Sequence, residues 1–207
     1  MNLEMDYSSP NARFTFDLKQ SPLFKKDHQN FINVVGRKQL NTLKNISLLD
    51  TYLGKNNIVE PHYHQNADEV VYCISGSITV SILHPFSKQL MNFTLTPGQI
   101  VNIPRGWWHY IVSLSDHTHF LAIFDAPNPE VILGSDILKF TPANIIARTY
   151  CLNENQWKQV VAPIKPPVFI GPAKDCHQSM EKIMSHSTAH QYAQPQYFPL
   201  PPYPPYW

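Results

Sequence analysis

The sequence predicts an all-β fold, an antiparallel barrel or sandwich that is followed by short helices and a proline-rich tail. Short runs alternate apolar and polar residues, as in Ile-Thr-Val-Ser-Ile at 78–82, which places the apolar side chains on one face of a strand. Turn sequences separate these runs, and Thr-Pro-Gly-Gln at 96–99 has the pattern of a type II turn. Many short strands with turns at this spacing favour an antiparallel sandwich or barrel.

The first elements are predicted in chain order from this alternation. We expect residues 1–13 to be flexible, 14–18 to form a short strand and 21–29 to form a loop. Further strands are predicted at 31–35, 46–53, 69–75, 77–83, 89–95, 100–103, 107–114 and 118–124.

The character of the chain changes after the last predicted strand. Thr141 and Pro142 read as the N-cap and first residue of a helix over 143–150, and Asn153 can cap a second helix that runs to Val161. We therefore assign 14–162 to one domain that includes these helices.

The segment 163–207 is predicted to be an extended, polyproline-like tail. Ten of the nineteen prolines lie in these last 45 residues, and proline neither pairs in a central strand nor continues a helix. Two interpretations stay open, a solvated tail or an adhesive segment whose Tyr and Trp side chains dock on another subunit or surface.

Composition and charge bear on which binding partners and which cellular location we expect. The net charge is +1, without the clustered Lys and Arg excess of a nucleic-acid-binding protein. No apolar run approaches the roughly 20 residues that cross a bilayer, and the polar N-terminus lacks a signal core. We expect a soluble cytoplasmic protein with no nucleic-acid or membrane partner. The three cysteines form no CxxC pair, which disfavours a disulfide scaffold or a cysteine zinc site.

The candidate metal ligands lie in two stretches of the sequence. His62 and His64 are two apart on a predicted strand and so point to the same face. The polar turn at 65–68 can reset the register, so that Glu69 faces the same cavity, and His109 arrives from another strand after a Pro-Arg-Gly corner. Three imidazoles and one carboxylate suit a divalent first-row metal, and the absence of thiolate favours Mn or Fe.

The spacing of these residues carries a resemblance. The runs His62-x-His64-x4-Glu69-x6-Gly76 and Gly98-x5-Pro104-x-Gly106-x2-His109 resemble the two paired motifs of the cupin superfamily, most closely its germin and oxalate decarboxylase branch. The likeness covers roughly 14–160. It implies a cupin jelly-roll β-barrel (a double-stranded β-helix) that holds a metal, usually manganese, through His62, His64, Glu69 and His109. Fe, Ni, Co and Zn are the alternatives. The resemblance also implies a homo-oligomer.

Other positions depart from this family pattern and bear on the reaction. Val59 stands three positions before His62, where oxalate decarboxylases have arginine and germins have asparagine, so oxalate itself is disfavoured. Glu60 and Glu130 are the candidate catalytic acids. Glu60 shares parity with His62, but a surface acid beside Pro61 is the favoured interpretation, and Glu130 is the one acid of the expected lid at 126–134.

Two functional hypotheses follow. In the first, the protein is a manganese-dependent enzyme that oxidises or decarboxylates a small organic acid bound in the barrel. In the second, it is a non-catalytic, metal-stabilised cupin that works through its surfaces and aromatic tail. Histidines at 117 and 119 form a second His-x-His pair, which we interpret as a polar strand start. His177, His186 and His190 lie in the tail, where a metal site and incidental histidines are equally good interpretations.

Overall fold

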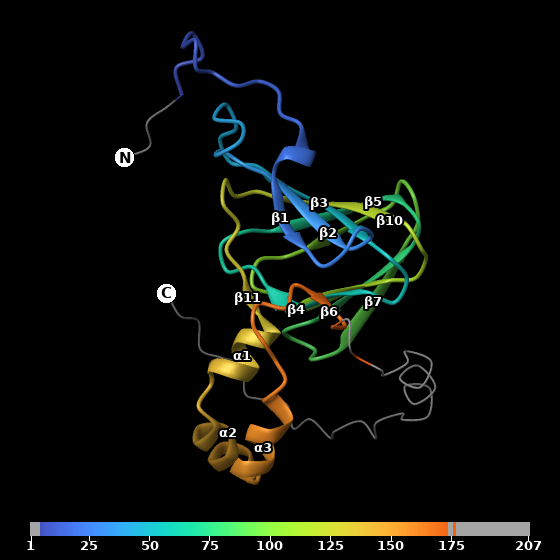
Figure 1. Ribbon diagram of the computed structural model, residues 1–207, viewed down its shortest axis with the longest axis vertical. Coiled ribbons are helices and arrows are strands. Elements are labelled where there is room, and N and C mark those ends of the chain that lie inside the picture. Colours follow the sequence, from blue (N-terminus) through green and yellow to red (C-terminus); the bar gives the residue numbers. More distant parts are fainter. Residues whose placement is uncertain (1–4, 174–175, 177–207) are drawn as a thin grey trace. The chain divides into compact units, whose positions relative to one another are not determined.

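Two antiparallel β-sheets pack face to face in this computed structural model, which describes residues 5–173 and Cys176 (Figure 1). Apolar side chains from both sheets meet in one core, including Val71 and Phe120 from one sheet and Val80 and Ile111 from the other. Alternating burial along the strands, as in β10, directs every second side chain into this core. The prediction of an all-β, jelly-roll barrel is confirmed.

The first sheet has the strand order β1-β2-β3-β10-β5-β8. Its strands span Pro22–Lys25, Phe31–Val35, Ser47–Leu53, Thr118–Phe124, Glu69–Ser75 and Ile100–Ile103. The second sheet has the order β11-β4-β9-β6-β7, with β12 also paired to β4. Its strands span Ile132–Leu133, Ile58–Tyr63, His109–Ser113, Ile78–Leu83, Leu90–Leu95 and Ile170–Gly171.

The predicted strands from 31 onward are present, with ends that differ by up to two residues. The predictions for the N-terminal segment were wrong. Residues 14–17 form no strand, a 3₁₀ helix spans Leu18–Gln20, and β1 lies where a loop was expected. The reason is local: the Asp17 side chain accepts a hydrogen bond from the Lys19 amide and starts the helical turn, while Phe14 is 69% exposed and has no core to face.

Two turns that the sequence predicts are present, and each contains a glycine with a positive φ. The amide of Gln99 donates to the carbonyl of Thr96 at 3.0 Å, and Gly98 has φ +88°, as a type II turn requires. Gly106 has φ +78°, and its amide donates to the carbonyl of His64 at 2.8 Å. The Pro-Arg-Gly corner is thus fastened to the end of β4 just before β9 begins.

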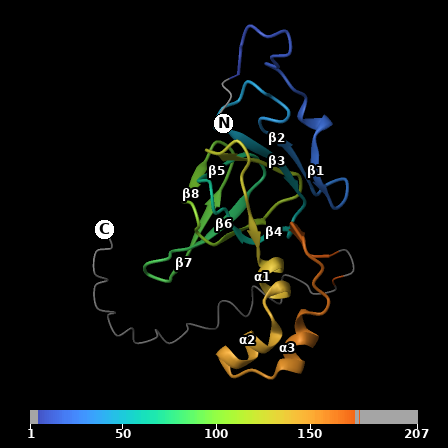
Figure 2. The ribbon, with the colours of Figure 1, turned by 90° about the vertical axis from the view of Figure 1, so that its left-hand side faces the viewer.

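Three short helices follow β11 (Figure 2): α1 at Gly134–Phe140, α2 at Ala143–Tyr150 and α3 at Glu154–Val161. The predictions for α2 and α3 are confirmed, and the Asn153 side chain accepts from the Gln156 amide at 3.0 Å. Pro142 stands at the N-cap of α2 rather than at its first residue. Helix α1 was not predicted. No helix in the described part of the chain is long and apolar enough to span a membrane.

The segment just beyond residue 162 belongs with the barrel. We had placed it in the tail, but Ile170 is buried and pairs with Val59 of β4. The predicted extended tail beyond Ala173, with His177, His186 and His190, lies outside the described residues. At the other end, where we predicted flexibility, the Arg13 amide donates to Asn41 Oδ1 at 2.8 Å.

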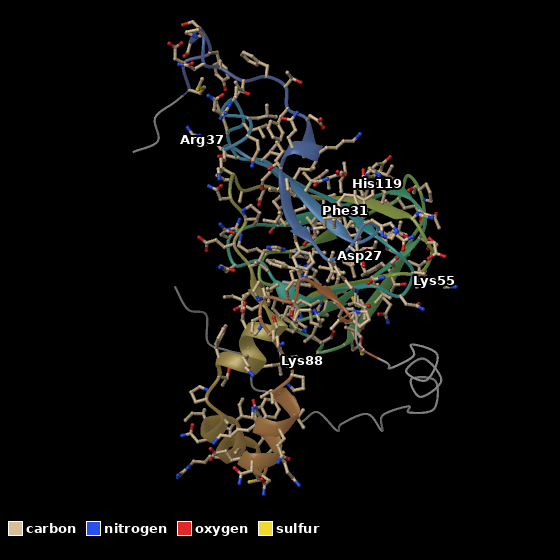
Figure 3. All side chains as sticks on the ribbon, viewed as in Figure 1. Asp27, Phe31, Arg37, Lys55, Lys88 and His119 are labelled. Atoms are coloured by element: carbon tan, nitrogen blue, oxygen red, sulfur yellow. The ribbon has the colours of Figure 1, made fainter. Side chains whose placement is uncertain are left out.

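One polar pair lies among aromatic rings on the first sheet, away from the core. His119 Nε2 lies 2.6 Å from Asp50 Oδ1, and the His119 ring stacks on Tyr52 with centroids 4.1 Å apart. Tyr52 in turn stacks on Phe31 at 4.5 Å. Figure 3 labels Phe31 and His119, the two outer rings of this stack. His119 is therefore held by Asp50 and a ring stack, in keeping with a structural role in its strand.

Candidate metal centre

Four side chains converge inside the barrel, and we call them the ligand cluster: His62, His64, Glu69 and His109. Each offers one nitrogen or oxygen atom, and all four atoms lie within 4.8 Å of one another. The side chains are 5%, 7%, 3% and 1% exposed, in that order. The structure therefore brings together all four residues that the sequence motifs selected.

Strand pairing places these side chains. His62 of β4 lies opposite His109 of β9, and Glu69, the first residue of β5, pairs with Phe124 of β10. Between them the chain turns at 65–68, where the Asp68 carboxylate accepts from the Arg105 amide at 2.8 Å. The turn resets the strand register, so Glu69 of one sheet faces the histidines of the other.

All three imidazoles are oriented in the same way. Each Nδ1 lies within hydrogen-bond distance of a backbone carbonyl, and a carbonyl can only accept. Each Nδ1 therefore carries a proton, and a ring that is neutral presents the lone pair of Nε2 to the cluster. The carbonyl partners of His62, His64 and His109 belong to Glu60, Glu130 and Trp107, at 2.6, 2.8 and 2.9 Å.

The centre of the cluster fits a cation. Glu69 Oε2 lies 3.3 Å from His64 Nε2 and 3.0 Å from His109 Nε2. Even so, Glu69 Oε2 and His109 Nε2 are the buried polar side-chain atoms without a hydrogen bond among the described residues. Unpaired buried acceptors are costly, and a divalent ion satisfies carboxylate and imidazole acceptors together.

Burial and neighbouring charges shift the pKa values within the cluster. Burial, with His109 nearby, lowers the pKa of His62 to about 3, so this ring is neutral at physiological pH. Burial alone acts to raise the pKa of Glu69, but His109 and His64 outweigh it and hold this pKa well below its usual range. Burial acts to lower the pKa of His109, but the Glu69 carboxylate outweighs it and raises the pKa. Glu69 is thus ionised and ready to ligate a metal.

A cavity of about 310 Å³ adjoins the ligand cluster, between the two sheets. His62, His64 and Glu69 form one part of its wall, and most of the rest is apolar. A concave, mostly apolar site with a few convergent polar groups is typical of small-molecule binding.

Comparison with known proteins decides the family. The family model described as Cupin matches residues 18–158. The chain belongs to the cupin family. The sequence resemblance to cupins is thereby confirmed, and the ligand cluster lies at the two motifs that carried it.

Curated cupin relatives include glycinin G3 of Glycine max and glutelin type-A 2 of Oryza sativa subsp. japonica. Glycinin G3 is 25% identical over 126 residues, which cover 59% of this chain and 26% of the relative. Glutelin type-A 2 is 24% identical over 162 residues, which cover 75% of this chain and 30% of the relative. The chain thus spans under a third of the length of these relatives.

Solved cupin structures share the fold at low sequence identity. Oxalate decarboxylase from Bacillus subtilis, a protein with Mn(II) centres, superposes with a TM-score of 0.67 at 20% identity, covering 81% of this chain and 44% of that one. Procruciferin, an 11S globulin from Brassica napus, superposes with a TM-score of 0.72 at 18% identity, covering 80% and 44%. The chain therefore shares its fold with an oxalate decarboxylase and with an 11S globulin.

Glu60, one candidate catalytic acid, is only 7% exposed and binds structural partners. Its Oε1 accepts from the amides of Val168 and Phe169 at 3.0 and 2.8 Å and from Ser135 Oγ at 3.1 Å. Its Oε2 accepts from the Ser135 amide at 2.9 Å. Glu60 therefore holds the first turn of α1 and the strand-like segment after Pro167 against β4, and it does not line the cavity.

Glu130, the other candidate acid, reaches the site through its backbone. Its carbonyl accepts from His64 Nδ1, whereas its exposed carboxylate accepts from Gln65 Nε2 at 3.0 Å. Asn66 holds this loop: its Oδ1 accepts from the Glu130 amide at 2.8 Å and its Nδ2 donates to the Asn128 carbonyl at 3.0 Å. Sequence analysis missed Asn66, because nothing in its local pattern signals a contact with a residue 64 positions away.

Proposed function

We propose that this cupin is a manganese-dependent enzyme that oxidises or decarboxylates a small organic acid bound in the barrel. The observation that carries the proposal is the convergence of three imidazoles and one carboxylate beside a cavity whose wall includes His62, His64 and Glu69. A set of four protein ligands would leave room on the ion for a substrate, as catalysis requires.

The ligand residues, the backbone carbonyls behind them and the apolar wall would have different roles in this enzyme. His62, His64, Glu69 and His109 would hold the ion, which when bound polarises a carboxylate or carbonyl oxygen of the substrate. The three carbonyls behind Nδ1 fix the tautomer and aim each ring, so the site needs little reorganisation. The apolar walls exclude water, which strengthens the electrostatic interactions inside.

The choice of manganese rests on ligand chemistry. Imidazole and carboxylate without thiolate suit Mn or Fe, and oxalate decarboxylase from Bacillus subtilis, which shares the fold, has Mn(II) centres. Fe, Ni, Co and Zn are the alternative ions. We also propose that the chain belongs to the germin-like branch of the cupins, because the spacing of its two motifs resembles that branch.

The test begins with elemental analysis of the purified protein. Oxygen consumption and carbon dioxide release are then measured with a panel of organic acids, before and after the metal is removed with a chelator. Metal-dependent turnover of at least one acid supports the enzyme. A metal-loaded protein that is inert to every acid contradicts it.

A second candidate function is a non-catalytic, metal-stabilised binding or structural cupin. Its support is that the two candidate acids are engaged elsewhere: Glu60 is bound by four donors, and the Glu130 side chain is exposed beside Gln65. Similarity to glycinin and glutelin relatives is in keeping with it. The role of the C-terminal tail as an adhesive segment belongs to this proposal.

We further propose a homo-oligomer and a cytoplasmic location. Tyr72, Ile74 and Ile100 are 37%, 37% and 62% exposed, and Tyr72 pairs with Ile100 across β5 and β8, so large apolar side chains gather at this sheet edge. Light scattering on the purified protein tests the oligomer, and cell fractionation tests the location.

A further inference from the structure

We propose that the cavity selects a singly charged carboxylate that chelates the metal through two oxygens and carries an apolar body, as a 2-oxo or 2-hydroxy monocarboxylic acid does. This inference rests on the proposed function, because it names the class of ligand for the same metal site. It follows from the lining of the cavity, from the charge of the site and from its volume.

The lining provides almost no polar partner beyond the ligand cluster. Apart from that cluster, its polar side chains among the described residues are Thr51 and Asn128. The rest is aliphatic, aromatic or proline, and representative members are Ile32, Leu49, Val59, Ile111, Phe120 and Val131. A substrate body in contact with this wall gains from being apolar and loses from carrying unpaired polar groups.

The charge of the loaded site favours a single negative charge. Metal ligands coordinate in their deprotonated forms, so a divalent ion with three neutral imidazoles and the Glu69 carboxylate has a net charge of +1. A monoanion brings this charge to zero, whereas a dianion such as oxalate leaves an excess negative charge in an apolar cavity.

Among the residues that the structure describes, the cavity wall has no cationic side chain to compensate such an excess. The described part of the lining contains no Lys or Arg. Arg105, in the corner before β9, is 55% exposed and lies 3.8 Å from the Asp125 carboxylate rather than in the cavity wall. Burying a charge without a partner is strongly unfavourable, so the dianion is disfavoured.

The volume sets the size of the apolar body. A cavity of about 310 Å³ lies at the lower end of the ~300–1,000 Å³ that is typical of small-molecule sites, so it suits a small acid rather than a large ligand. 2-Oxohexanoate is an acid of this small size with an apolar body. Pyruvate has the same chelating head without the body, and hexanoate has the body without the second donor oxygen.

The experiment uses the full chain loaded with manganese, and metal content is measured on every sample. Titration calorimetry compares 2-oxohexanoate, pyruvate, hexanoate and oxalate at one pH and ionic strength. We expect 2-oxohexanoate to bind at least tenfold more tightly than each of the other three, because three added methylenes and a second donor oxygen both contribute. Oxalate binding as tightly as 2-oxohexanoate to the loaded protein overturns the inference.

A charge variant provides the reciprocal test. Val59→Arg places a cation in the cavity wall, and we expect oxalate affinity to rise at least tenfold relative to 2-oxohexanoate. Val160→Arg, at a position that is 71% exposed on α3, adds the same charge outside the cavity and should leave the preference unchanged. If folded, metal-loaded Val59→Arg has the same preference between oxalate and 2-oxohexanoate as the wild type, the inference is contradicted. If the variant does not fold, the calorimetry of the four ligands with the wild type tests the inference.

Failure of this inference is distinguishable from failure of the proposed function. Protein that takes up no metal overturns both. Loaded protein that prefers 2-oxohexanoate but turns over no acid supports the ligand class and contradicts the enzyme. Loaded protein that turns over an acid but prefers oxalate contradicts the ligand class alone.

Discussion

His109 Nε2 lies 3.0 Å from Glu69 Oε2, inside the barrel, and neither atom makes a hydrogen bond with the described residues. Both atoms are acceptors when the imidazole is neutral, because Nδ1 of His109 donates to the Trp107 carbonyl. Two buried acceptors at this distance repel each other unless a cation or a proton lies between them. This relationship links the metal affinity of the site to pH.

Metal binding should release a proton from His109 at a pH where an ordinary histidine has already lost it. Glu69 raises the pKa of His109 above its ordinary value of about 6.5, so the metal-free protein retains this proton to a higher pH than an ordinary histidine does, whereas the pKa of His62, about 3, leaves that ring neutral. Metal must displace that proton, so apparent affinity rises with pH until the raised pKa is passed. Calorimetry in buffers of different ionisation enthalpy counts the protons.

The control for this measurement is His28→Ala, which removes an exposed histidine outside the ligand cluster and should leave proton release unchanged. Proton release that ends at the pH where an ordinary histidine loses its proton would contradict the raised pKa of His109.

Asn66→Ala should weaken metal binding without touching a ligand. Asn66 fixes the loop whose Glu130 carbonyl holds His64 Nδ1, so its loss frees the His64 ring to reorient. Loss of such an outer contact typically lowers metal affinity 10–100-fold, and we expect about tenfold. A competition titration with a metal-sensitive dye measures the dissociation constant.

Gln65→Ala is the matched control, because the Gln65 side chain donates to the exposed Glu130 carboxylate rather than to the Glu130 carbonyl that holds His64. It should bind metal as the wild type does. Equal affinities in both variants would remove the support for a positioning role of Asn66.

Glu60→Gln should destabilise the fold and leave metal content unchanged. The carboxylate accepts four hydrogen bonds, and an amide at this place turns one acceptor into a donor that faces other donors. We expect a loss of about 2 kcal/mol in the free energy of unfolding, measured by urea denaturation of the metal-free protein. Unchanged stability with abolished turnover would instead indicate that Glu60 acts as a catalytic acid or base.

Sequence analysis predicted the parts of the fold that are encoded locally. Alternation specifies strands such as β6, Asn153 caps α3, and motif spacing selected the ligand cluster, because residues near the ends of paired strands meet once the barrel closes. The type II turn at 96–99 follows from a proline and a glycine that stand next to each other.

The missed features depend on contacts between distant residues. Strand β12 pairs Ile170 with Val59, and the Phe169 amide donates to Glu60 across 109 positions, so no local pattern marks these contacts. Helix α1 begins where the Glu60 carboxylate satisfies the Ser135 amide, so its start signal also comes from another strand. The local alternation at 14–18 predicted a strand, but Phe14 is 69% exposed and the chain forms a 3₁₀ helix at Leu18–Gln20 instead.

The central claim is tested most directly by the metal content of the purified chain and of His64→Ala, with His28→Ala as the control. After incubation with manganese and removal of free metal, elemental analysis should find one ion per chain in the wild type and in His28→Ala. His64→Ala should retain less than a tenth of that amount while remaining folded by circular dichroism. Equal manganese in His64→Ala and the wild type, or none in the wild type, would contradict the metal centre described above.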